Sequence, residues 1–337
     1  MNYVRLGDSG LKVSELCLGT WHLPRLTETD PYGVPKVDTE ETRRVVNAAF
    51  DHGINFIDTA NRYHGAMAPV DAYHYGNAEN VLSEILRDHE RESFVLATKV
   101  GNEMAPWPNG HGLSRKHMFW QMNESLKRLK LEYVDVYLAH LPDEETPHLE
   151  TLRAFNDLVA AGKAHYIGCS NFTIEQIVDF MELSKLHELV SFVSLQDEYN
   201  LINRSIESDK LPLARNYKFT IMAYSAIAQG LLSGRYLDGV PVGSRATYYQ
   251  SLKKALTEKN LNSLRELSTL ASEKGVSLPQ FAIAWILHKQ KKLGVNMIPI
   301  IGVSSRKQLL EDLEALEVRL SEEDVSKAEK IALSMQA

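Results

Sequence analysis

Three side chains able to carry charge or exchange protons stand at the ends of three successive apolar runs. They are Asp58, Lys99 and His140, and Tyr63 follows five residues after the aspartate. A free tyrosine has a pKa of about 10, too high for efficient proton exchange near pH 7. A neighbouring ammonium favours the phenolate and so lowers that pKa, while an aspartate holds the lysine charged and in place. A histidine beside them can hydrogen-bond a substrate carbonyl.

Such a set predicts protonation of an oxygen on which negative charge builds, as in reduction of a carbonyl by hydride from a bound carrier. Taken singly, each residue has an ordinary explanation. Asp58 can cap a turn, Lys99 can extend to solvent, and His140 and Tyr63 can pack in loops. Placement at three consecutive run ends favours one site over three coincidences.

Eight short apolar runs alternate with helical patterns along the chain. Continuous β-branched and aromatic runs are typical of strands buried on both faces of a parallel sheet. Strands alternating with helices in this number predict a (β/α)8 TIM barrel, with residues 1–337 as one domain. A doubly wound sheet is the alternative, weakened because no GxGxxG follows the first run. The runs are ELCLGT (15–20), INFIDTA (54–60), SFVLATKV (93–100), VDVYLAH (134–140), AHYIGCSN (164–171), FVSLQDEY (192–199), FTIMAYS (219–225) and VNMIPIIGVSS (295–305).

The segments around these runs carry readable turn and helix-end signals. VRLGDSGLKVSEL near the N-terminus predicts a short β-hairpin that turns at residues 8–10 and plugs one barrel end. Long connections at 61–77, 101–113 and 228–260 are typical of functional loops. Helix starts are expected at Asp38 with Glu41 as a capping box, at Thr146 with Pro147, at Thr173 with Gln176, at Ser277, and at Ser304 or Ser305, and Gly53 closes the first of these helices.

Composition bounds the class of protein. Of 337 residues 44% are hydrophobic and 24% charged, which is ordinary for a globular protein. The net charge of −7 argues against a nucleic-acid partner, although a few local arginines can still hold an anionic cofactor. The N-terminus has no apolar signal region and no apolar run approaches the roughly 20 residues that span a bilayer. Two cysteines, Cys17 and Cys169, lie in apolar runs, so we expect a cytoplasmic protein without disulfides or membrane contact.

The same residues resemble the aldo-keto reductase family over nearly the whole chain. INFIDTANRY is similar to the strand-2 signature of that family, and ATK (97–99) and VDVYLAH are similar to its lysine and histidine segments. The resemblance implies a catalytic tetrad of Asp58, Tyr63, Lys99 and His140. Four more segments resemble cofactor-binding segments of the family: GKAHYIGCSNF (162–172), SLQDEYNLINR (194–204), YSAIAQGLLSGRY (224–236) and IIGVSSRKQLLEDLEAL (300–316).

Carried over position by position, the resemblance implies a nicotinamide dinucleotide site. Ser170, Asn171 and Gln196 correspond to carboxamide contacts, and Tyr224 to the residue that stacks on the nicotinamide. The ends of the first and second strands, which correspond to further cofactor contacts, carry Gly19, Thr20, Trp21 and Asp58. Asp312 departs from the asparagine expected in the family, which puts one adenine contact in doubt. The segment that corresponds to the pyrophosphate site contains Ser225, Ile227, Gln229, Leu231 and Ser233. The last loop, which corresponds to the adenosine site, contributes Ser304, Gln308, Glu311 and Asp312. Two basic positions, Arg235 and Arg245, match a branch of the family that has a long loop after strand 7 and includes potassium-channel β subunits.

Charge favours NADP(H) over NAD(H) as the cofactor. An acidic protein needs local basic groups for a 2′-phosphate, and arginine is the best-suited donor. Arg245 and Arg306, with Lys307 beside the latter, are the candidates, although Arg306 and Lys307 equally fit a solvated helix start.

The sequence indicates the substrate less clearly than it indicates the reaction. Trp21, Trp107 and the segment 63–75 are expected to border a pocket for an apolar or aromatic carbonyl compound, although packing between loops is the usual role of tryptophan. No phosphate or carboxylate clamp for the substrate stands out, and composition does not indicate the oligomeric state.

Two other functions fit parts of the sequence. A metal-dependent hydrolase barrel would use Asp58, His64, His111, His117 and His140, but no HxH pair ends the first run. An NADPH-binding regulatory subunit with weak turnover is the non-enzymatic alternative. Some binding-type relatives have another residue at the position that matches His140. The histidine here therefore favours an enzyme.

The proton donor itself has two candidates. FIDTANRYHG (56–65) places Tyr63 close to the strand that ends at Asp58, whereas YGNAEN (75–80) resembles the YGxxE helix start that ordinarily follows the catalytic tyrosine. The family motif is thus split by an inserted segment, HGAMAPVDAYH (64–74), which we expect to form a lip of the substrate pocket. We favour Tyr63 over Tyr75, because distance from the strand is the tighter constraint.

Overall fold

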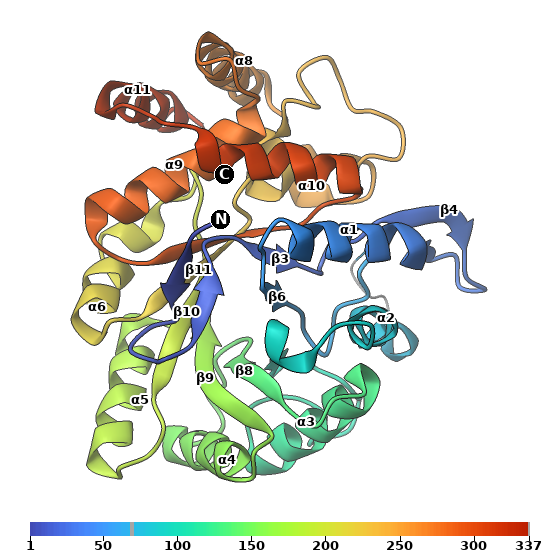
Figure 1. The fold of residues 1–337 in the computed structure, drawn as a ribbon, viewed down its shortest axis with the longest axis vertical. Coiled ribbons are helices and arrows are strands. Elements are labelled where there is room, and N and C mark those ends of the chain that lie inside the picture. The colour runs from blue at the N-terminus through green and yellow to red at the C-terminus, as the bar shows by residue number, and fades with distance from the viewer. Residues whose placement is uncertain (68–70, 336–337) are drawn as a thin grey trace.

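A closed barrel of eight parallel strands forms the centre of the molecule. The computed structural model describes residues 1–67 and 71–335, and Figure 1 shows the helices arranged around the barrel. Each expected apolar run contains one barrel strand, and the strands follow one another around the barrel in chain order, so the predicted TIM barrel is confirmed. The strands are β3 (Cys17–Gly19), β6 (Phe56–Asp58), β7 (Val95–Val100), β8 (Val134–Ala139), β9 (Ala164–Ser170), β10 (Phe192–Glu198), β11 (Thr220–Tyr224) and β12 (Met297–Ile301).

Helices surround the barrel and bury one face against it or against neighbouring helices. Amphipathic patterns explain this: in α1, for example, Val45, Val46 and Ala49 are fully buried. None of the helices in the described part of the chain combines the length and apolar character that crossing a bilayer requires. The helices are α1 (Thr39–Asp51), α2 (Asn77–Leu86), α3 (Arg115–Leu129), α4 (His148–Ala160), α5 (Ile174–Leu186), α6 (Lys210–Tyr217), α7 (Gln250–Ala255), α8 (Glu258–Glu273), α9 (Leu278–Leu293), α10 (Arg306–Leu313) and α11 (Glu322–Ala332).

Several helix starts agree with the predicted caps. Thr173 and Ser277 each form a complete capping box, and Ser305 rather than Ser304 accepts from the Gln308 amide. Asp38 accepts from the Glu41 amide, but the expected return bond is missing because the Glu41 carboxylate accepts from the Arg306 amide at 2.8 Å. The capping box at Asp38 is therefore half formed.

Two further helix ends differ slightly from expectation. Pro147 is the capping residue itself, and α4 begins one residue later at His148. The connection 228–260 is not a plain loop, since it contains two 3-10 turns and α7.

The N-terminal hairpin closes one end of the barrel. Strands β1 (Tyr3–Arg5) and β2 (Lys12–Ser14) pair antiparallel, with Tyr3 opposite Ser14. Leu6 and Val13 are fully buried in the cluster that fills the lower barrel, together with Phe56 and Val136. Figure 1 shows the hairpin in front of the barrel strands. The chemistry predicted at the carboxyl ends of the strands therefore has only the opposite end of the barrel available.

A second hairpin, which the sequence reading missed, follows the first barrel strand. Strands β4 (Arg25–Thr29) and β5 (Pro35–Val37) pair antiparallel and lie beyond α1 in Figure 1. Their residues are mostly exposed, so no apolar pattern marked them. The signal that was available is the turn sequence DPYG at 30–33, where Asp30 accepts from the amides of Tyr32 and Val34.

A buried histidine joins this hairpin to the inserted segment. His74, which is 4% exposed, lies with Nδ1 2.7 Å from an oxygen of Asp71 and Nε2 2.7 Å from an oxygen of Asp30. The rings of Tyr32 and Tyr73 stack beside it, with centroids 5.2 Å apart. We call these five residues the loop clasp. Residues 68–70 of the inserted segment lie outside the described residues.

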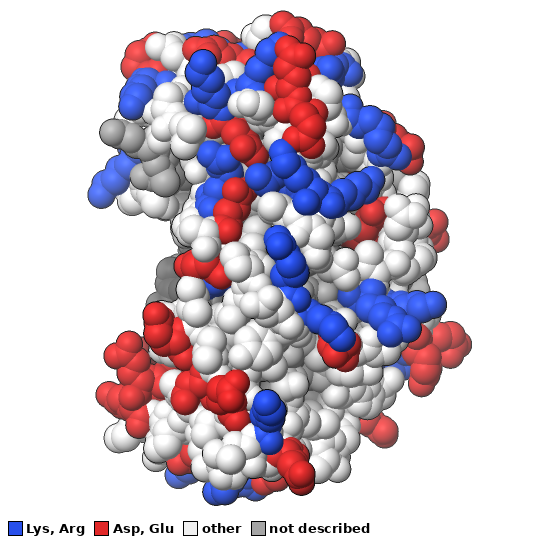
Figure 2. Space-filling view, turned by 90° about the vertical axis from the view of Figure 1, so that its left-hand side faces the viewer, with Lys and Arg blue, Asp and Glu red and all other residues white. Residues whose placement is uncertain are grey.

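Acidic and basic side chains alternate on the outer helices. Figure 2 shows this for the face that carries α5 and α6, where lysines and arginines lie beside aspartates and glutamates. Many such side chains pair, for example Arg115 with Asp157 on neighbouring helices α3 and α4. Such exposed pairs contribute about 0–1 kcal/mol each, so the buried core rather than the surface carries the stability of the barrel.

The YGxxE start of α2 has a structural explanation in a buried ion pair. Glu79 is fully buried, accepts from the Thr98 hydroxyl at 2.6 Å, and pairs with Arg128 Nε at 2.6 Å. Gly76 has φ of +75°, and a Cβ there would lie 2.3 Å from Arg128 Nε. The glycine is thus required both by its backbone conformation and by the close approach of the arginine that neutralises Glu79.

We predict that Gly76→Ala destabilises the protein far more than Gly275→Ala. Both glycines have φ near +70°, but a Cβ at Gly275 has no atom within 4 Å. The backbone conformation alone costs about 1–2 kcal/mol in an L-residue. Displacing Arg128 from a buried carboxylate adds about 3–5 kcal/mol. Urea unfolding of both variants measures the difference, and equal losses would show that the contact with Arg128 is unimportant.

Candidate active site

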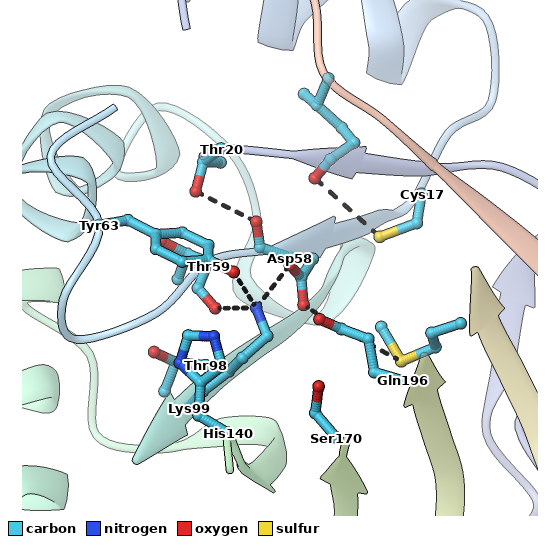
Figure 3. Close-up of polar contacts among 12 residues, drawn as sticks. Cys17, Thr20, Asp58, Thr59, Tyr63, Thr98, Lys99, His140, Ser170 and Gln196 are labelled. Carbon is cyan, nitrogen blue, oxygen red and sulfur yellow. Dashed lines mark hydrogen bonds and ion pairs between the residues drawn. The ribbon is translucent and has the colours of Figure 1, made fainter. Parts of the chain in front are cut away.

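The ammonium of Lys99 lies at the centre of the polar groups at the open end of the barrel. Lys99 Nζ is 2.6 Å from Asp58 Oδ2, 2.8 Å from the Thr59 carbonyl oxygen and 3.1 Å from the Tyr63 hydroxyl. Figure 3 shows the lysine nitrogen between these three oxygens. Strand register explains the arrangement, because Asp58 is paired with Ala97 and the two strand ends therefore lie side by side.

Full burial makes this lysine dependent on its partners. The side chain of Lys99 is 0% exposed, so water does not solvate its charge. Burial alone lowers the pKa of Lys99, but the Asp58 carboxylate and the Tyr63 hydroxyl outweigh burial and raise it above its ordinary value. An unpaired buried charge would be strongly unfavourable, so Asp58 is what keeps this ammonium in the core.

Tyr63 remains protonated in this environment. Burial raises the pKa of Tyr63, and the opposing attraction of Lys99 does not bring it below the ordinary value of 10. Lys99 does lower the pKa of Tyr63, as expected. The expectation that the pKa would fall below its ordinary value was wrong, because burial raises it by more. A neutral phenol with a positive neighbour is a proton donor whose conjugate base has a stabilising partner waiting.

His140 is a neutral base at the same end of the barrel. Burial first, and then the charges of Lys99 and Arg62, lower its pKa well below the ordinary value. Its ring meets the edge of the Tyr63 ring with centroids 5.6 Å apart. Asn102, which the sequence reading did not select, has its amide nitrogen 2.8 Å from His140 Nδ1.

The two tyrosines occupy different environments. Tyr63 lines a cavity at the open end of the barrel and contacts Lys99. Tyr75 is half-buried, is absent from that lining, and lies under the Arg62 guanidinium at 4.8 Å from the ring centroid. Only Tyr63 is brought together with Asp58, Lys99 and His140.

On the other side of Asp58, four amide and hydroxyl side chains form an ordered wall. Gln196 Nε2 donates to Asp58 Oδ1 at 2.8 Å. Asn171, with φ of +64°, donates to the His140 carbonyl at 3.1 Å and accepts from the Tyr224 hydroxyl at 2.8 Å. Ser170 Oγ accepts from the same asparagine at 2.9 Å. The Asn171 backbone amide donates to the Gln196 carbonyl at 3.2 Å, so hydrogen bonds join the four residues that the family resemblance places around a nicotinamide.

A cavity of about 450 Å³ extends from Tyr63 along this wall to the loops after β11 and β12. Its volume lies within the ordinary range for small-molecule sites. Thr20, Leu231 and Glu311 do not line it: the first two are buried, and the third is exposed. The predicted residues that do line it are Gly19, Trp21, Asp58, Tyr63, His140, Ser170, Asn171, Gln196, Tyr224, Ser225, Ile227, Gln229, Ser233, Arg235, Arg245, Ser304, Gln308 and Asp312.

Arg245 lies at the far side of the cavity between two aromatic rings. Its guanidinium carbon is 5.0 Å from the Trp21 ring centroid and 4.9 Å from that of Tyr249. Its Nε is buried without a hydrogen-bond partner among the described residues. Burial lowers the pKa of Arg245, although the guanidinium stays charged at neutral pH. A cation held without an anionic partner fits an anionic group of a ligand, whereas Arg306 and Lys307 are exposed and absent from the lining.

Several lining residues escaped the sequence reading, and one predicted residue is misplaced. His22 directly follows Trp21, and this adjacency was the signal that could have found it. Burial and the nearby Arg245 lower the pKa of His22 to about 4. Trp107 is 55% exposed and packs on Trp120, so it does not border the cavity as expected. The other lining residues that were missed include Asn102, Leu141, Glu198, Tyr236, Tyr249, Ile283 and Ile300.

The hydrolase alternative lacks a metal site. Within residues 1–67 and 71–335, no three His, Cys, Asp or Glu side chains gather as metal ligands would. His64 packs against His74 of the loop clasp, and His117 lies at the start of α3 with Nδ1 3.1 Å from the Asn109 carbonyl.

Comparison with known proteins agrees with this geometry. The sequence model of the Aldo/keto reductase family matches residues 15–333, and the chain belongs to the aldo/keto reductase family. The chain is 36% identical over 325 residues to L-glyceraldehyde 3-phosphate reductase of Escherichia coli strain K12, covering 94% of this chain and 88% of the relative.

Relatives with another kind of name are equally similar. A putative voltage-gated potassium channel subunit beta of Schizosaccharomyces pombe is 36% identical over 340 residues, covering 97% of this chain and 92% of that protein. A probable subunit of the same kind from Oryza sativa subsp. japonica is 35% identical over 345 residues, covering 99% and 97%. The chain thus resembles the potassium-channel β-subunit-like members of the family as well as its reductases.

We predict that Asp312→Asn stabilises the protein more at pH 8 than at pH 5. Burial, with a smaller contribution from Glu311, raises the pKa of Asp312 to about 7. Because the folded pKa lies above the unfolded value of about 3.9, the penalty grows as pH rises from about 4 to 7, reaching at most about 4 kcal/mol. Asparagine removes the charge and therefore the penalty. Thermal unfolding at both pH values measures the effect.

Glu311→Gln serves as the control for Asp312→Asn. Glu311 is exposed and contributes less than burial does, so its replacement should change the melting temperature little at either pH. An equal gain at pH 5 and pH 8 for Asp312→Asn would contradict the charge-burial explanation.

Proposed function

We propose that this protein reduces an aldehyde or a ketone to the alcohol, and catalyses the reverse oxidation, with NADP(H) as hydride carrier. The observation that supports the proposal most is the Lys99-centred hydrogen-bond set, which leaves a neutral Tyr63 hydroxyl at the wall of the cavity. Membership of the aldo/keto reductase family, and the name of the L-glyceraldehyde 3-phosphate reductase relative, support the same reaction class.

Tyr63 acts as the general acid in this proposal. When negative charge builds on the carbonyl oxygen, the Tyr63 hydroxyl donates its proton to that oxygen. The phenolate that results lies 3.1 Å from the Lys99 ammonium, which stabilises it. Asp58, at 2.6 Å, keeps the lysine charged throughout. His140 donates a hydrogen bond to the same carbonyl oxygen and lowers the barrier further.

The residues of the cavity fit a nicotinamide dinucleotide. When bound, NADPH supplies the hydride that reaches the carbonyl carbon. Ser170, Asn171 and Gln196 present amide and hydroxyl groups for the carboxamide, and the Tyr224 ring lies beside them. Arg245 offers a buried nitrogen that has no hydrogen-bond partner within residues 1–67 and 71–335, which suits the 2′-phosphate that distinguishes NADPH from NADH.

The remaining members of the proposed cofactor site follow the cavity. Around the pyrophosphate we place Ser225, Ile227, Gln229, Ser233 and Arg235, and around the adenosine Ser304, Gln308 and Asp312, with Gly19 and Trp21 opposite. Thr20, Leu231 and Glu311 belong to the same segments but do not line the cavity. Residues 1–337 would act as one domain. The two cysteines are free and buried, which suits the reducing cytoplasm that we propose as its location.

A regulatory role is the second candidate. The potassium channel subunit names of two relatives favour it. In that role this protein would bind NADPH and turn over weakly. Complete proton-transfer machinery argues for turnover, because a binding protein has no need of a buried lysine beneath a tyrosine. Steady-state turnover with small aldehydes, among them glyceraldehyde 3-phosphate, separates the two roles.

We predict that Tyr63→Phe lowers kcat/KM for NADPH-dependent aldehyde reduction by about 10²–10⁴-fold, the usual contribution of general acid catalysis. Tyr75→Phe should stay within a few-fold of wild type, because Tyr75 does not line the cavity. Both variants should bind NADPH normally in a tryptophan-fluorescence titration, which separates lost chemistry from lost binding. Unchanged turnover in Tyr63→Phe would refute the assignment of the acid.

We predict that Arg245→Leu weakens NADPH binding by about 10–100-fold and NADH binding much less. Hydrogen bonds to charged groups contribute about 1.5–3 kcal/mol, and only NADPH carries the 2′-phosphate. Lys307→Leu is the matched control, because Lys307 is 85% exposed and does not line the cavity. Calorimetric titrations with both cofactors measure the effect. Equal weakening for NADPH and NADH would assign Arg245 to the pyrophosphate instead.

A further inference from the structure

A neutral histidine can donate from only one of its two ring nitrogens, so its tautomer decides what it can do. His140 is held neutral by burial and by the charges of Lys99 and Arg62. If the proton is on Nε2, the ring donates through Nε2 and accepts through Nδ1; the other tautomer reverses these roles. A carbonyl oxygen needs a donor, and a histidine with the wrong tautomer would face it with a lone pair.

The strand ends bring one amide against this ring. Asn102 follows β7 by two residues and His140 follows β8 directly, and these neighbouring strands are paired in register at Val100 and Ala139. The His140 amide donates to the Val100 carbonyl at 2.7 Å, which extends the pairing into the loops. Asn102 Nδ2 then lies 2.8 Å from His140 Nδ1.

An amide nitrogen only donates, so His140 Nδ1 must accept in this contact. Within the described residues, the Asn102 amide is the only hydrogen-bond partner of the His140 ring. The other groups that face the ring do not compete for Nδ1. Lys99 and Arg62 are cations without acceptor atoms. Tyr63 makes a T-shaped ring contact with His140, and among the described residues its hydroxyl bonds Lys99 rather than the imidazole.

We propose that Asn102 is the positioning residue that fixes the tautomer of His140, with the proton on Nε2, so that the ring can donate to the substrate carbonyl oxygen. The inference rests on the proposed carbonyl reduction for its consequence, but the tautomer itself is a property of the free protein. Asn102 acts through the histidine rather than on the substrate, as residues that hydrogen-bond the second ring nitrogen of a reactive histidine commonly do.

The first test reads the tautomer directly. The ¹⁵N chemical shifts of the two ring nitrogens distinguish protonated from unprotonated nitrogen, and His140→Gln identifies the His140 signals. Wild type should show Nε2 protonated and Nδ1 unprotonated. Asn102→Leu keeps the branching and the number of side-chain heavy atoms but removes the donor, so both tautomers should be populated. Asn102→Asp places an acceptor against Nδ1 and should move the proton to Nδ1 at alkaline pH.

The second test uses the pH dependence of kcat/KM. Asn102→Asp should lower kcat/KM at pH 8 by about 10²–10³-fold, the usual effect of removing one donor to a developing oxyanion. A carboxylate raises the pKa of the neighbouring histidine, so as pH falls the imidazolium forms, Nε2 donates again, and kcat/KM should partly recover. Lys99, Arg62 and Tyr63, the other charged or titratable groups at the ring, are unchanged in this variant. A merely structural role for Asn102 would give no recovery at acid pH.

Matched variants control for charge and for folding. Asn123→Asp adds a carboxylate to an exposed position of α3 outside the site and should leave both the His140 shifts and kcat/KM unchanged. NADPH affinity should be the same in wild type and in all Asn102 variants. A variant that failed to bind NADPH would be misfolded at the site, and the ¹⁵N shifts of wild type would then decide alone.

The outcomes separate this inference from the proposed function. Wild-type turnover with the His140 proton on Nδ1, or an unchanged tautomer in Asn102→Asp, overturns the role of Asn102 and leaves carbonyl reduction standing. If the tautomers are as predicted but the protein does not turn over carbonyl compounds with NADPH, the role of Asn102 is supported and the proposed function is overturned.

Discussion

The buried charge of Lys99 is the constraint on which the arrangement of the site depends. An ammonium with no solvent exposure is tolerable only with close acceptors, and the protein provides a carboxylate, a backbone carbonyl and a phenol within 3.1 Å. Each acceptor comes from the end of β6 or the loop after it. The barrel register, which sets β6 beside β7, therefore determines the site, and the tyrosine has little freedom to lie elsewhere.

Support for the lysine extends behind the strand. Side chains alternate along β7, so Thr98, next to Lys99, points outward and meets the buried Glu79 of α2. Arg128 of α3 neutralises that glutamate. The YGxxE pattern is thus explained by a second buried ion pair that holds α2 and α3 against the strand. Glu79 and Arg128 make this pair, so it does not depend on the residues between Tyr63 and Gly76.

The sequence supported the barrel and the strand-end residues because both depend on periodic and positional signals. Apolar runs marked every barrel strand, and five residues of separation were enough to place Tyr63 near Asp58. Loop residues carry no period, so Asn102, Tyr249 and the β4–β5 hairpin went unseen, and Trp107 was placed at a cavity it does not reach. The sequence likewise could not predict whether the pKa of Tyr63 is raised or lowered. That outcome depends on the balance between burial of the ring, which raises the pKa, and the nearby ammonium, which lowers it.

The loop clasp has a consequence for how this enzyme scaffold can change. His74 belongs to the loop after β6, and its two nitrogens bind Asp71 of that same loop and Asp30 of the hairpin after β3. Exchange of the hairpin alone would leave the buried imidazole without its Asp30 acceptor, and exchange of the loop after β6 alone would leave Asp30 without the histidine. The two loops therefore form one transferable unit: divergence by recombination, or grafting between scaffolds, has to move both together.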